Sequence, residues 1–246
     1  MSRRAWVEQL MGMPMSIHVR ADDPNRSDIE RAVQAAYTEL ARMEDLFTTY
    51  RADSQLSRLR RGELTFAGCD PLVAAARDLG EQAREVTGGA FTTQLPDGAG
   101  GFAFDPTGLV KGWAVDRAGD YLAGLAGVSW CINAGGDVLA GRHRYVPPPG
   151  VDAAPWRIGV ENPHDRAQVA RVVTVESGAV ATSGTAARGA HLYDPVADVQ
   201  VGRAGSSTVV GPTLLWADIW ATALFVGGTA AREHFAAQAE YSAFDL

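Results

Sequence analysis

Segments of helical periodicity alternate irregularly with strand-like segments along the 246 residues of this chain, without the regular rhythm of a doubly wound parallel sheet. This order favours an α+β fold, in which packed helices cover mixed or antiparallel sheets. We expect a single domain over residues 1–246, one compact unit of two intimately associated halves with a flexible loop at 142–155. Helices are predicted over residues 27–46, 71–86, 110–125, 212–226 and 230–239. Strands are predicted over residues 13–19, 130–139, 156–161, 169–176, 179–183, 206–211 and 241–246.

Two of these helices carry signals at their first turns. In the helix expected at 27–46, Ser27 is followed three residues later by Glu30, which is the spacing of a capping box. In the helix expected at 212–226, Pro212 suits the first turn because an N–H group is not needed there. The apolar face of the first helix is predicted at Ile29, Val33, Ala36, Tyr37, Leu40 and Met43.

The charge balance argues against a general nucleic-acid or anionic-membrane binder. The chain has 22 basic and 29 acidic residues and a formal net charge of −7, whereas such binders carry a basic excess or a basic run. No run of about 20 apolar residues is present, so membrane insertion is not expected. The N-terminal pair Arg3 and Arg4 is followed by Glu8 and Pro14 rather than by an apolar export segment, and we expect a cytoplasmic protein.

Two short segments place a carboxylate beside glycines that leave the backbone uncovered. Residues 105–108 read Asp-Pro-Thr-Gly directly before the helix predicted at 110–125, so Thr107 and Gly108 would lie at its positive end. Residues 133–137 read Asn-Ala-Gly-Gly-Asp, and we expect them to form a turn inside or at the end of the strand predicted at 130–139. Each segment alone could be an ordinary turn. Together they suit a phosphorylated ligand and a hard cation, because backbone N–H groups bind phosphate and carboxylates hold Mg²⁺.

Asp218 and Thr222 lie four positions apart in the helix predicted at 212–226, and they therefore share one helix face. A carboxylate and a hydroxyl so placed could both coordinate Mg²⁺ or Ca²⁺. The alternative is that Asp218 only interacts with the helix dipole. The bulky apolar residues around the pair favour a metal site, since a polar pair in such surroundings needs a partner.

Further candidate residues lie in hydroxyl-rich and aromatic segments. Residues 181–185, Ala-Thr-Ser-Gly-Thr, end a predicted strand and could bind phosphate or ribose. His191 follows them and could act as a general base, although a lone histidine is more often structural. Tyr50 could stack on a heteroaromatic ligand. The turn at 162–165 carries no functional signal.

Six segments match the pattern of a known family in chain order. Residues 105–116, Asp-Pro-Thr-Gly-Leu-Val-Lys-Gly-Trp-Ala-Val-Asp, are similar to a motif Asp-Leu-Gly-Gly-Ile-Ala-Lys-Gly-Tyr-Ala-Val-Asp. Residues 49–59 are similar to a stretch Thr-Tyr-x-x-Asp-Ser-Glu-Leu-Ser-Arg-Leu. The other four are Met-Gly-Met at 11–13, Asn-Ala-Gly-Gly-Asp at 133–137, Ala-Thr-Ser-Gly at 181–184, and the Ala-Asp and Ala-Thr-Ala pieces of 217–223. Over nearly its whole length, the chain resembles the ApbE family, the FAD:protein FMN transferases.

The resemblance implies a substrate, a metal and a reaction. Members of this family bind FAD and Mg²⁺ and move the FMN half of FAD onto a threonine or serine hydroxyl of a target flavoprotein, with release of AMP. By resemblance, Asp218 and Thr222 would be metal ligands together with the carbonyl of Gly108, and His191 would be the base. The residues implied to line or support the flavin-nucleotide pocket are Met13, Tyr50, Asp105, Lys111, Asp116, Asp137, Thr182 and Ser183.

Two loops depart from the family pattern. The Gly-Gly-Ala-Phe at 88–91 is followed by Thr-Thr rather than by Asp-Pro-Thr, and the segment 191–198 keeps its His and Asp-Pro but lacks the usual Thr-Gly. Two alternatives to the transferase therefore stay open. A Mg²⁺-dependent FAD pyrophosphatase would use the same site with water in place of the acceptor hydroxyl, giving FMN and AMP. A non-catalytic protein would bind FAD and leave it uncleaved.

Overall fold

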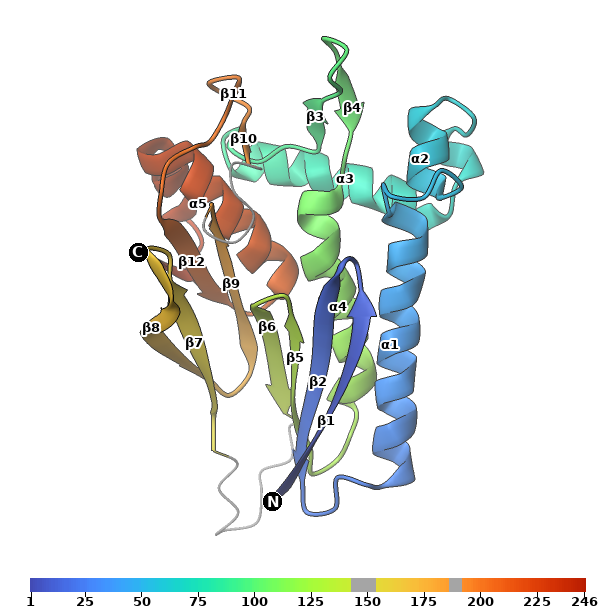
Figure 1. Cartoon of the computed structure of the whole chain (residues 1–246), viewed down its shortest axis with the longest axis vertical. Coiled ribbons are helices and arrows are strands. Elements are labelled where there is room, and N and C mark those ends of the chain that lie inside the picture. The colour runs from blue at the N-terminus through green and yellow to red at the C-terminus, as the bar shows by residue number, and fades with distance from the viewer. Residues whose placement is uncertain (143–153, 186–191) are drawn as a thin grey trace.

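The computed structural model describes residues 1–142, 154–185 and 192–246. His191 and most of the loop expected at 142–155 therefore lie outside the described residues. Within the described residues, a seven-stranded sheet forms the centre of the fold and three two-stranded ladders accompany it. Figure 1 shows the helices gathered on one face of this sheet.

The strands of the large sheet lie side by side in the order in which they occur in the chain, and each neighbouring pair is antiparallel. The predicted α+β class with packed helices is confirmed. The seven strands are β1 (Ser2–Leu10), β2 (Met13–Ala21), β5 (Ser129–Ala134), β6 (Asp137–Arg142), β9 (Gly178–Gly184), β12 (Ser206–Gly211) and β13 (Ser242–Asp245). The ladders pair β3 (Gln94–Pro96) with β4 (Phe102–Phe104), β7 (Trp156–Asn162) with β8 (Asp165–Val175), and β10 (Tyr193–Asp194) with β11 (Val199–Gln200).

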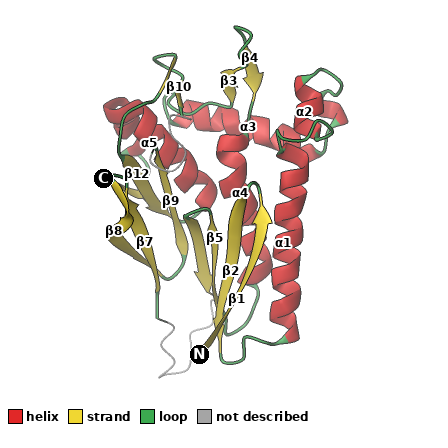
Figure 2. Ribbon diagram, in the orientation of Figure 1, coloured by secondary structure: helices red, strands yellow, loops and turns green. Residues whose placement is uncertain are grey.

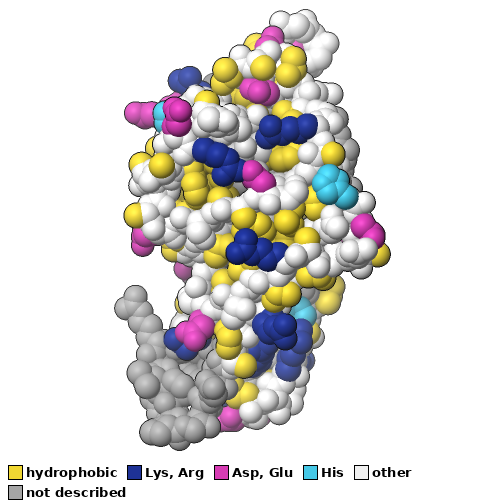
Figure 3. Space-filling view, turned by 90° about the vertical axis from the view of Figure 1, so that its left-hand side faces the viewer, with side chains coloured by type: hydrophobic (Ala, Val, Ile, Leu, Met, Phe, Trp, Pro, Cys, Tyr) yellow, Lys and Arg dark blue, Asp and Glu magenta, His cyan; other side chains and the backbone are white. Residues whose placement is uncertain are grey.

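The large sheet is covered on both faces. Helices α1 (Ser27–Phe47), α4 (Thr107–Ala123) and α5 (Leu214–Phe235) pack on one face, with α3 (Pro71–Val86) across their upper ends (Figures 1 and 2). The β7–β8 hairpin packs on the other face, where Trp156 and Val175 contact Val138 and Val180. Figure 3, which looks at the left-hand side of Figure 1, shows basic, acidic and hydrophobic side chains interspersed over the surface.

The residue pattern of β2 and α1 explains the main core. Met15, Ile17 and Val19 alternate along β2 and are fully buried toward the helices, because successive strand side chains point to opposite faces. The six apolar residues predicted to form one face of α1 are all at most 2% exposed. One of them, Tyr37, also donates its hydroxyl to the carbonyl of Met15 at 3.2 Å, which ties α1 to the sheet.

The predicted capping box at the start of α1 is wrong. Arg26 is the residue at the N-cap; its side chain pairs with the carboxylate of Asp28 at 2.9 Å and caps no backbone N–H group of the helix. Ser27 is already the first helical residue. Glu30 forms an ion pair with Arg4 of β1 at 2.7 Å, so its carboxylate joins α1 to the edge strand instead of closing the helix end.

The two helices predicted at 212–226 and 230–239 are joined in α5, with a kink at Gly228 (φ 53°, ψ −127°). Because α5 begins at Leu214, Pro212 precedes the helix and does not occupy its first turn. By length and a mean hydropathy of 1.4, α5 could cross a membrane, but 67% of this stretch is buried inside the fold, as in a core helix.

Several other elements add to or differ from the sequence-based prediction. The turn expected inside or at the end of the strand at 130–139 lies inside it, at Gly135 and Gly136, and divides this range into the β5–β6 hairpin. The short strands β3, β4, β10 and β11 had no predicted counterpart. β1 had no predicted counterpart, since most of its residues are exposed and give no core pattern. The short helix α2 (Gln55–Arg60) was also not predicted; it begins where the hydroxyl of Ser54 accepts from the N–H of Ser57 at 3.1 Å.

Candidate active site

A cavity of about 530 Å³ opens where the start of α4, the β5–β6 turn, β9 and α5 meet the C-terminal end of α1. Its depth and mixed polar and apolar lining are typical of a small-molecule site. Ten residues singled out in the sequence line this one cavity: Met13, Tyr50, Asp105, Gly108, Lys111, Asp137, Thr182, Ser183, Asp218 and Thr222.

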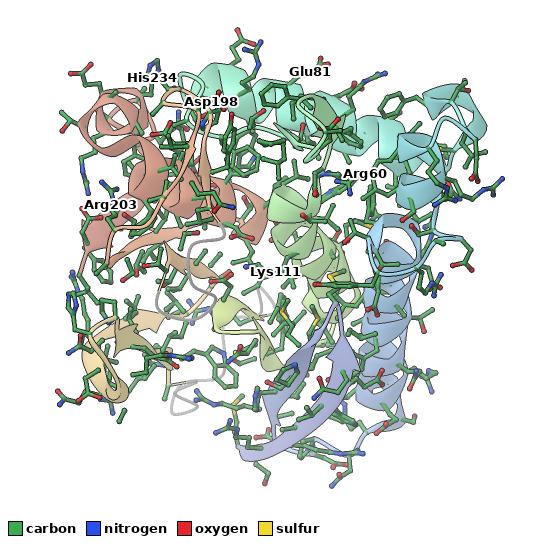
Figure 4. All side chains as sticks on the ribbon, turned by 45° about the horizontal axis from the view of Figure 1, so that its top comes forward. Arg60, Glu81, Lys111, Asp198, Arg203 and His234 are labelled. Atoms are coloured by element: carbon green, nitrogen blue, oxygen red, sulfur yellow. The ribbon has the colours of Figure 1, made fainter. Side chains whose placement is uncertain are left out.

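An ion cluster lies at the polar end of the cavity. The ammonium group of Lys111 pairs with the carboxylate of Asp137 and lies 3.3 Å from Oδ2 of Asp218. Both aspartates are only 4% exposed, and Figure 4 shows Lys111 directed from α4 into the middle of the molecule. The cluster places two carboxylates close together at the cavity, and carboxylate oxygens are the ligands that hard cations such as Mg²⁺ prefer.

Hydroxyl and backbone groups join the strands of the cavity wall to α5. Asp137 accepts a hydrogen bond from the N–H of Thr182 at 2.8 Å, which links β6 to β9. The hydroxyls of Ser183 and Thr222 lie 2.8 Å apart, which links β9 to α5. The predicted hydroxyl-rich segment therefore faces the predicted metal-ligand helix.

The β5–β6 turn requires its two glycines. Gly135 and Gly136 have φ values of +63° and +108°, which side chains rarely adopt. The side chain of Asn133 accepts from the N–H of Gly136 at 2.9 Å and closes the turn. A Cβ atom at Gly135 would lie 2.7 Å from the sulfur of Met13, so glycine here lets Met13 approach the cavity wall.

Asp105 caps the helix that carries Lys111. Its carboxylate accepts from the N–H of Thr107 at 3.0 Å and from the hydroxyl of Thr107 at 2.6 Å. It also forms an ion pair with Arg60 of α2 at 2.6 Å. Gly108 follows in the first turn of α4, and the exposed N–H groups of such a turn attract anionic groups.

Asp116 does not line the cavity, in contrast to the other described residues that the resemblance implied. Its two carboxylate oxygens accept from the N–H groups of Leu214 and Leu215, each at 2.8 Å. Asp116 therefore caps α5, the helix that carries Asp218 and Thr222. Burial raises the pKa of Asp116 to about 6, and the two N–H donors act in the opposite direction.

The donor set at the cavity fits a hard cation. Asp218 supplies a buried carboxylate oxygen, and Thr222 supplies a hydroxyl one helical turn later on the same face. Among the described residues there is no cluster of three or more Asp, Glu, His or Cys side chains that could hold a metal. A site here would thus combine one carboxylate with hydroxyl, carbonyl and ligand oxygens, as Mg²⁺ sites on phosphorylated substrates do.

Sequence reasoning missed a whole wall of the cavity. The tip of the β7–β8 hairpin reaches it through Gly159, Pro163 and Arg166, close to the turn that carried no functional signal. Arg166 pairs with Glu161 at 3.0 Å across the hairpin. Tyr50, which was predicted, is 93% exposed at the mouth, so its ring is available to stack on a ligand there.

Comparison with known proteins identifies the family. The ApbE family model matches residues 11–97 and 93–244. The chain is 29% identical, over 154 residues, to the FAD:protein FMN transferase of Vibrio cholerae serotype O1; the match covers 58% of this chain and 43% of that protein. The chain thus spans less than half the length of this curated relative.

Solved structures share the fold. The flavin transferase ApbE from Vibrio cholerae is 22% identical with a TM-score of 0.74, covering 98% of this chain and 92% of its own. The apo flavinyl transferase ApbE of Pseudomonas stutzeri is 21% identical with a TM-score of 0.77, and the match covers 99% of this chain and 90% of that chain. The ApbE protein of Thermotoga maritima is 19% identical with a TM-score of 0.75, covering 98% and 93%. On the match of the family model to nearly its full length, this chain belongs to the ApbE family.

Proposed function

We propose that the protein is a Mg²⁺-dependent FAD:protein FMN transferase, which moves FMN from FAD to a threonine or serine hydroxyl of a flavoprotein. One observation carries the proposal: ten residues that the family resemblance implied, from six different segments of the chain, line a single cavity. The name of the Vibrio cholerae relative supports the same reaction.

In the proposed reaction, the acceptor hydroxyl oxygen attacks the phosphorus on the FMN side of the FAD pyrophosphate. A new P–O bond joins FMN to the acceptor, and the bond from this phosphorus to the bridging oxygen breaks. AMP leaves with the bridging oxygen and its electron pair. The hydroxyl proton passes to a base, which we assign to His191 from the resemblance alone, because His191 lies outside the described residues.

The chain's own groups position and neutralise the pyrophosphate. The first turn of α4, which is the positive end of the helix dipole, lies at the cavity with Gly108, and Lys111 presents an ammonium group from the next turn. Asp218 and Thr222 would hold Mg²⁺ together with the Gly108 carbonyl. Mg²⁺ would supply charge neutralisation on the phosphate oxygens. Met13 and Tyr50 would border the flavin nucleotide, and the backbone and hydroxyls of Thr182 and Ser183 would face its polar part.

The test is an incubation of the purified protein with FAD, with Mg²⁺ or with EDTA, and with or without a flavoprotein bearing a candidate acceptor threonine. AMP, free FMN and protein-bound flavin are then separated and quantified. AMP in equal amount to covalently bound flavin is the expected result. AMP with only free FMN in every acceptor tube would favour the pyrophosphatase, and FAD left intact throughout would contradict both enzymes.

A further inference from the structure

A second groove runs beside the main cavity, between α2 and the β3–β4 hairpin. Leu95 and Asp105 belong to the walls of both spaces, so the groove adjoins the cavity. In Figure 1 the hairpin projects from the top of the molecule, between β10 and α2. The groove is lined by Leu59, Arg60, Phe66, Leu95, Pro96, Asp97, Phe102, Ala103, Phe104 and Asp105.

The groove has polar as well as apolar walls, and aromatic side chains gather in its outer part. Phe102 is 59% exposed there. The ring of Phe66 meets the ring of Phe104 edge to face, with centroids 5.4 Å apart. Three aromatic rings thus line a space open to solvent, and aromatic side chains are the residues that most often anchor a protein partner.

Among the described residues, no strand pairs with β4 on the side that faces away from β3. Asp97 donates to the carbonyl of Gly101 at 3.0 Å, and Asp105 donates to the carbonyl of Thr93 at 2.7 Å. Because bonded and non-bonded pairs alternate in an antiparallel ladder, the backbone groups of Phe102 and Phe104 point away from β3. An extended peptide can add to such an edge by main-chain hydrogen bonds.

Arg60 fixes the inner end of this edge. Its guanidinium donates to the carbonyl of Phe104 at 2.8 Å and pairs with Asp105 at 2.6 Å. Figure 4 shows Arg60 beside the start of α4. Thus α2 lies on the side of β4 that faces away from β3, and the groove leads inward to Asp105, three residues before Gly108 in the main cavity.

We propose that this groove docks an extended segment of the acceptor protein, with an apolar side chain placed among Phe66, Phe102 and Phe104. The segment lies along β4 and delivers its threonine or serine hydroxyl past Asp105 into the main cavity. The inference rests on the proposed transferase function, because a protein acceptor must reach the FAD pyrophosphate from outside while FAD occupies the cavity.

The experiment follows the attachment of flavin to protein. A soluble extract of the source organism's cells is incubated with FAD, Mg²⁺ and the purified enzyme, and covalently bound flavin is read by its fluorescence after denaturing electrophoresis. Initial rates are measured over a range of extract concentrations. The Kd for FAD is measured for each variant by quenching of flavin fluorescence in EDTA, which also shows that the variant is folded.

Phe102→Asp places a charge among the aromatic rings of the groove, whereas Phe102→Leu keeps the side chain apolar. Val7→Asp is the matched control, because it introduces the same charge at a 63% exposed position on β1. We expect F102D to label its acceptor about tenfold more slowly at low extract concentration, with recovery as the extract is concentrated. F102L and V7D should label like the wild type, and all four proteins should have the same Kd for FAD.

Three results would overturn the inference, and they are distinct. Equal labelling by F102D and the wild type means that the acceptor does not use the groove. A raised Kd for FAD in F102D, in proportion to its slower labelling, assigns the groove to the nucleotide instead. A wild-type lane without any covalent flavin, from a protein that still binds FAD, contradicts the transferase function itself and the groove inference with it.

Discussion

Lys111 connects two buried carboxylates that come from different elements. Asp137 is carried by the β5–β6 turn and Asp218 by α5, and the ammonium group of Lys111 is within ion-pair distance of both. Asp137 also accepts from the N–H of Thr182. If the charge of Asp218 is removed, the Lys111–Asp137 pair remains. The role of Asp218 can therefore be tested with little disturbance to the fold.

The metal assignment predicts a specific loss in Asp218→Asn. The variant keeps the size of the side chain but removes its charge, so Mg²⁺ would be held weakly. We expect Mg²⁺-dependent cleavage of FAD to fall by roughly 10²–10³-fold, since a metal supplies several kcal/mol of transition-state stabilisation. Asp120→Asn, at an exposed position on α4, is the control and should have no effect. A D218N protein with an unchanged rate and Mg²⁺ dependence would remove Asp218 from the metal site.

The raised pKa of Asp116 predicts that the unfolding free energy of the protein depends on pH. Burial raises its pKa to about 6 in the folded protein, above the value in the unfolded chain. Between about pH 4 and pH 6 the folded state thus binds more protons, and this contribution to the unfolding free energy is lost as pH rises. The loss is at most about 3 kcal/mol. We compare the unfolding free energies of the wild type and Asp116→Asn, measured by urea denaturation. Their difference should shrink between about pH 4 and pH 6 and stay constant above about pH 6. If the two plots of unfolding free energy against pH are parallel at all pH values, Asp116 does not titrate in this pH window.

At the scale of single elements, α5 joins the core and the site. The N–H groups of its first two residues are held by Asp116 of α4, and its fifth and ninth residues, Asp218 and Thr222, line the cavity. The close approach of the two helices depends on Gly112, where a Cβ atom would lie 2.7 Å from the carbonyl oxygen of Leu214. The position of the proposed metal ligands therefore depends on a residue outside the cavity.

Gly112→Ala should destabilise the protein although alanine favours a helix. The added methyl group would push on the backbone of α5, and overpacking of this kind costs about 1–3 kcal/mol. Gly124→Ala is the matched control at the other end of α4, because nothing lies within 4 Å of the Cβ atom added there. Thermal unfolding should give a lower Tm for G112A only. A G112A protein as stable as G124A would mean that the helices can separate without cost.

The sequence predicted elements well where periodicity was strong and poorly where it was weak. α3 has the predicted bounds, since Pro71 and the Thr-Gly-Gly after Val86 mark both ends. β1 was missed because, as an edge strand, most of its residues face solvent and show no core alternation. α5 was predicted as two helices because its kink at Gly228 reads as a helix end, whereas tertiary packing carries the helix through it.

At the scale of the whole molecule, the cavity is assembled from segments that are distant in the chain. The residues with distinctive chemistry, such as Asp137, Thr182 and Asp218, were predictable because carboxylates and hydroxyls in motifs signal a ligand site. The cavity wall made by Gly159 and its neighbours could not be predicted from the sequence. Glycine and apolar residues form the same sequence pattern in a strand that only belongs to the core. Only the packing of the β7–β8 hairpin over the large sheet brings that wall to the site.

A cavity built from elements across the whole fold predicts global stabilisation by its ligand. On the proposed function the folded chain binds FAD and the unfolded chain does not, so in EDTA a concentration of 100 times Kd should raise the unfolding free energy by about 2.7 kcal/mol. For a chain of this size, Tm should rise by several degrees, on the order of 2–4 °C per kcal/mol. NAD⁺, which has the AMP and pyrophosphate parts but no flavin, is the control and should raise Tm less, because it cannot use Met13 and Tyr50. Differential scanning calorimetry measures both shifts. No shift with FAD, or an equal shift with NAD⁺, would contradict a flavin-nucleotide site in this cavity.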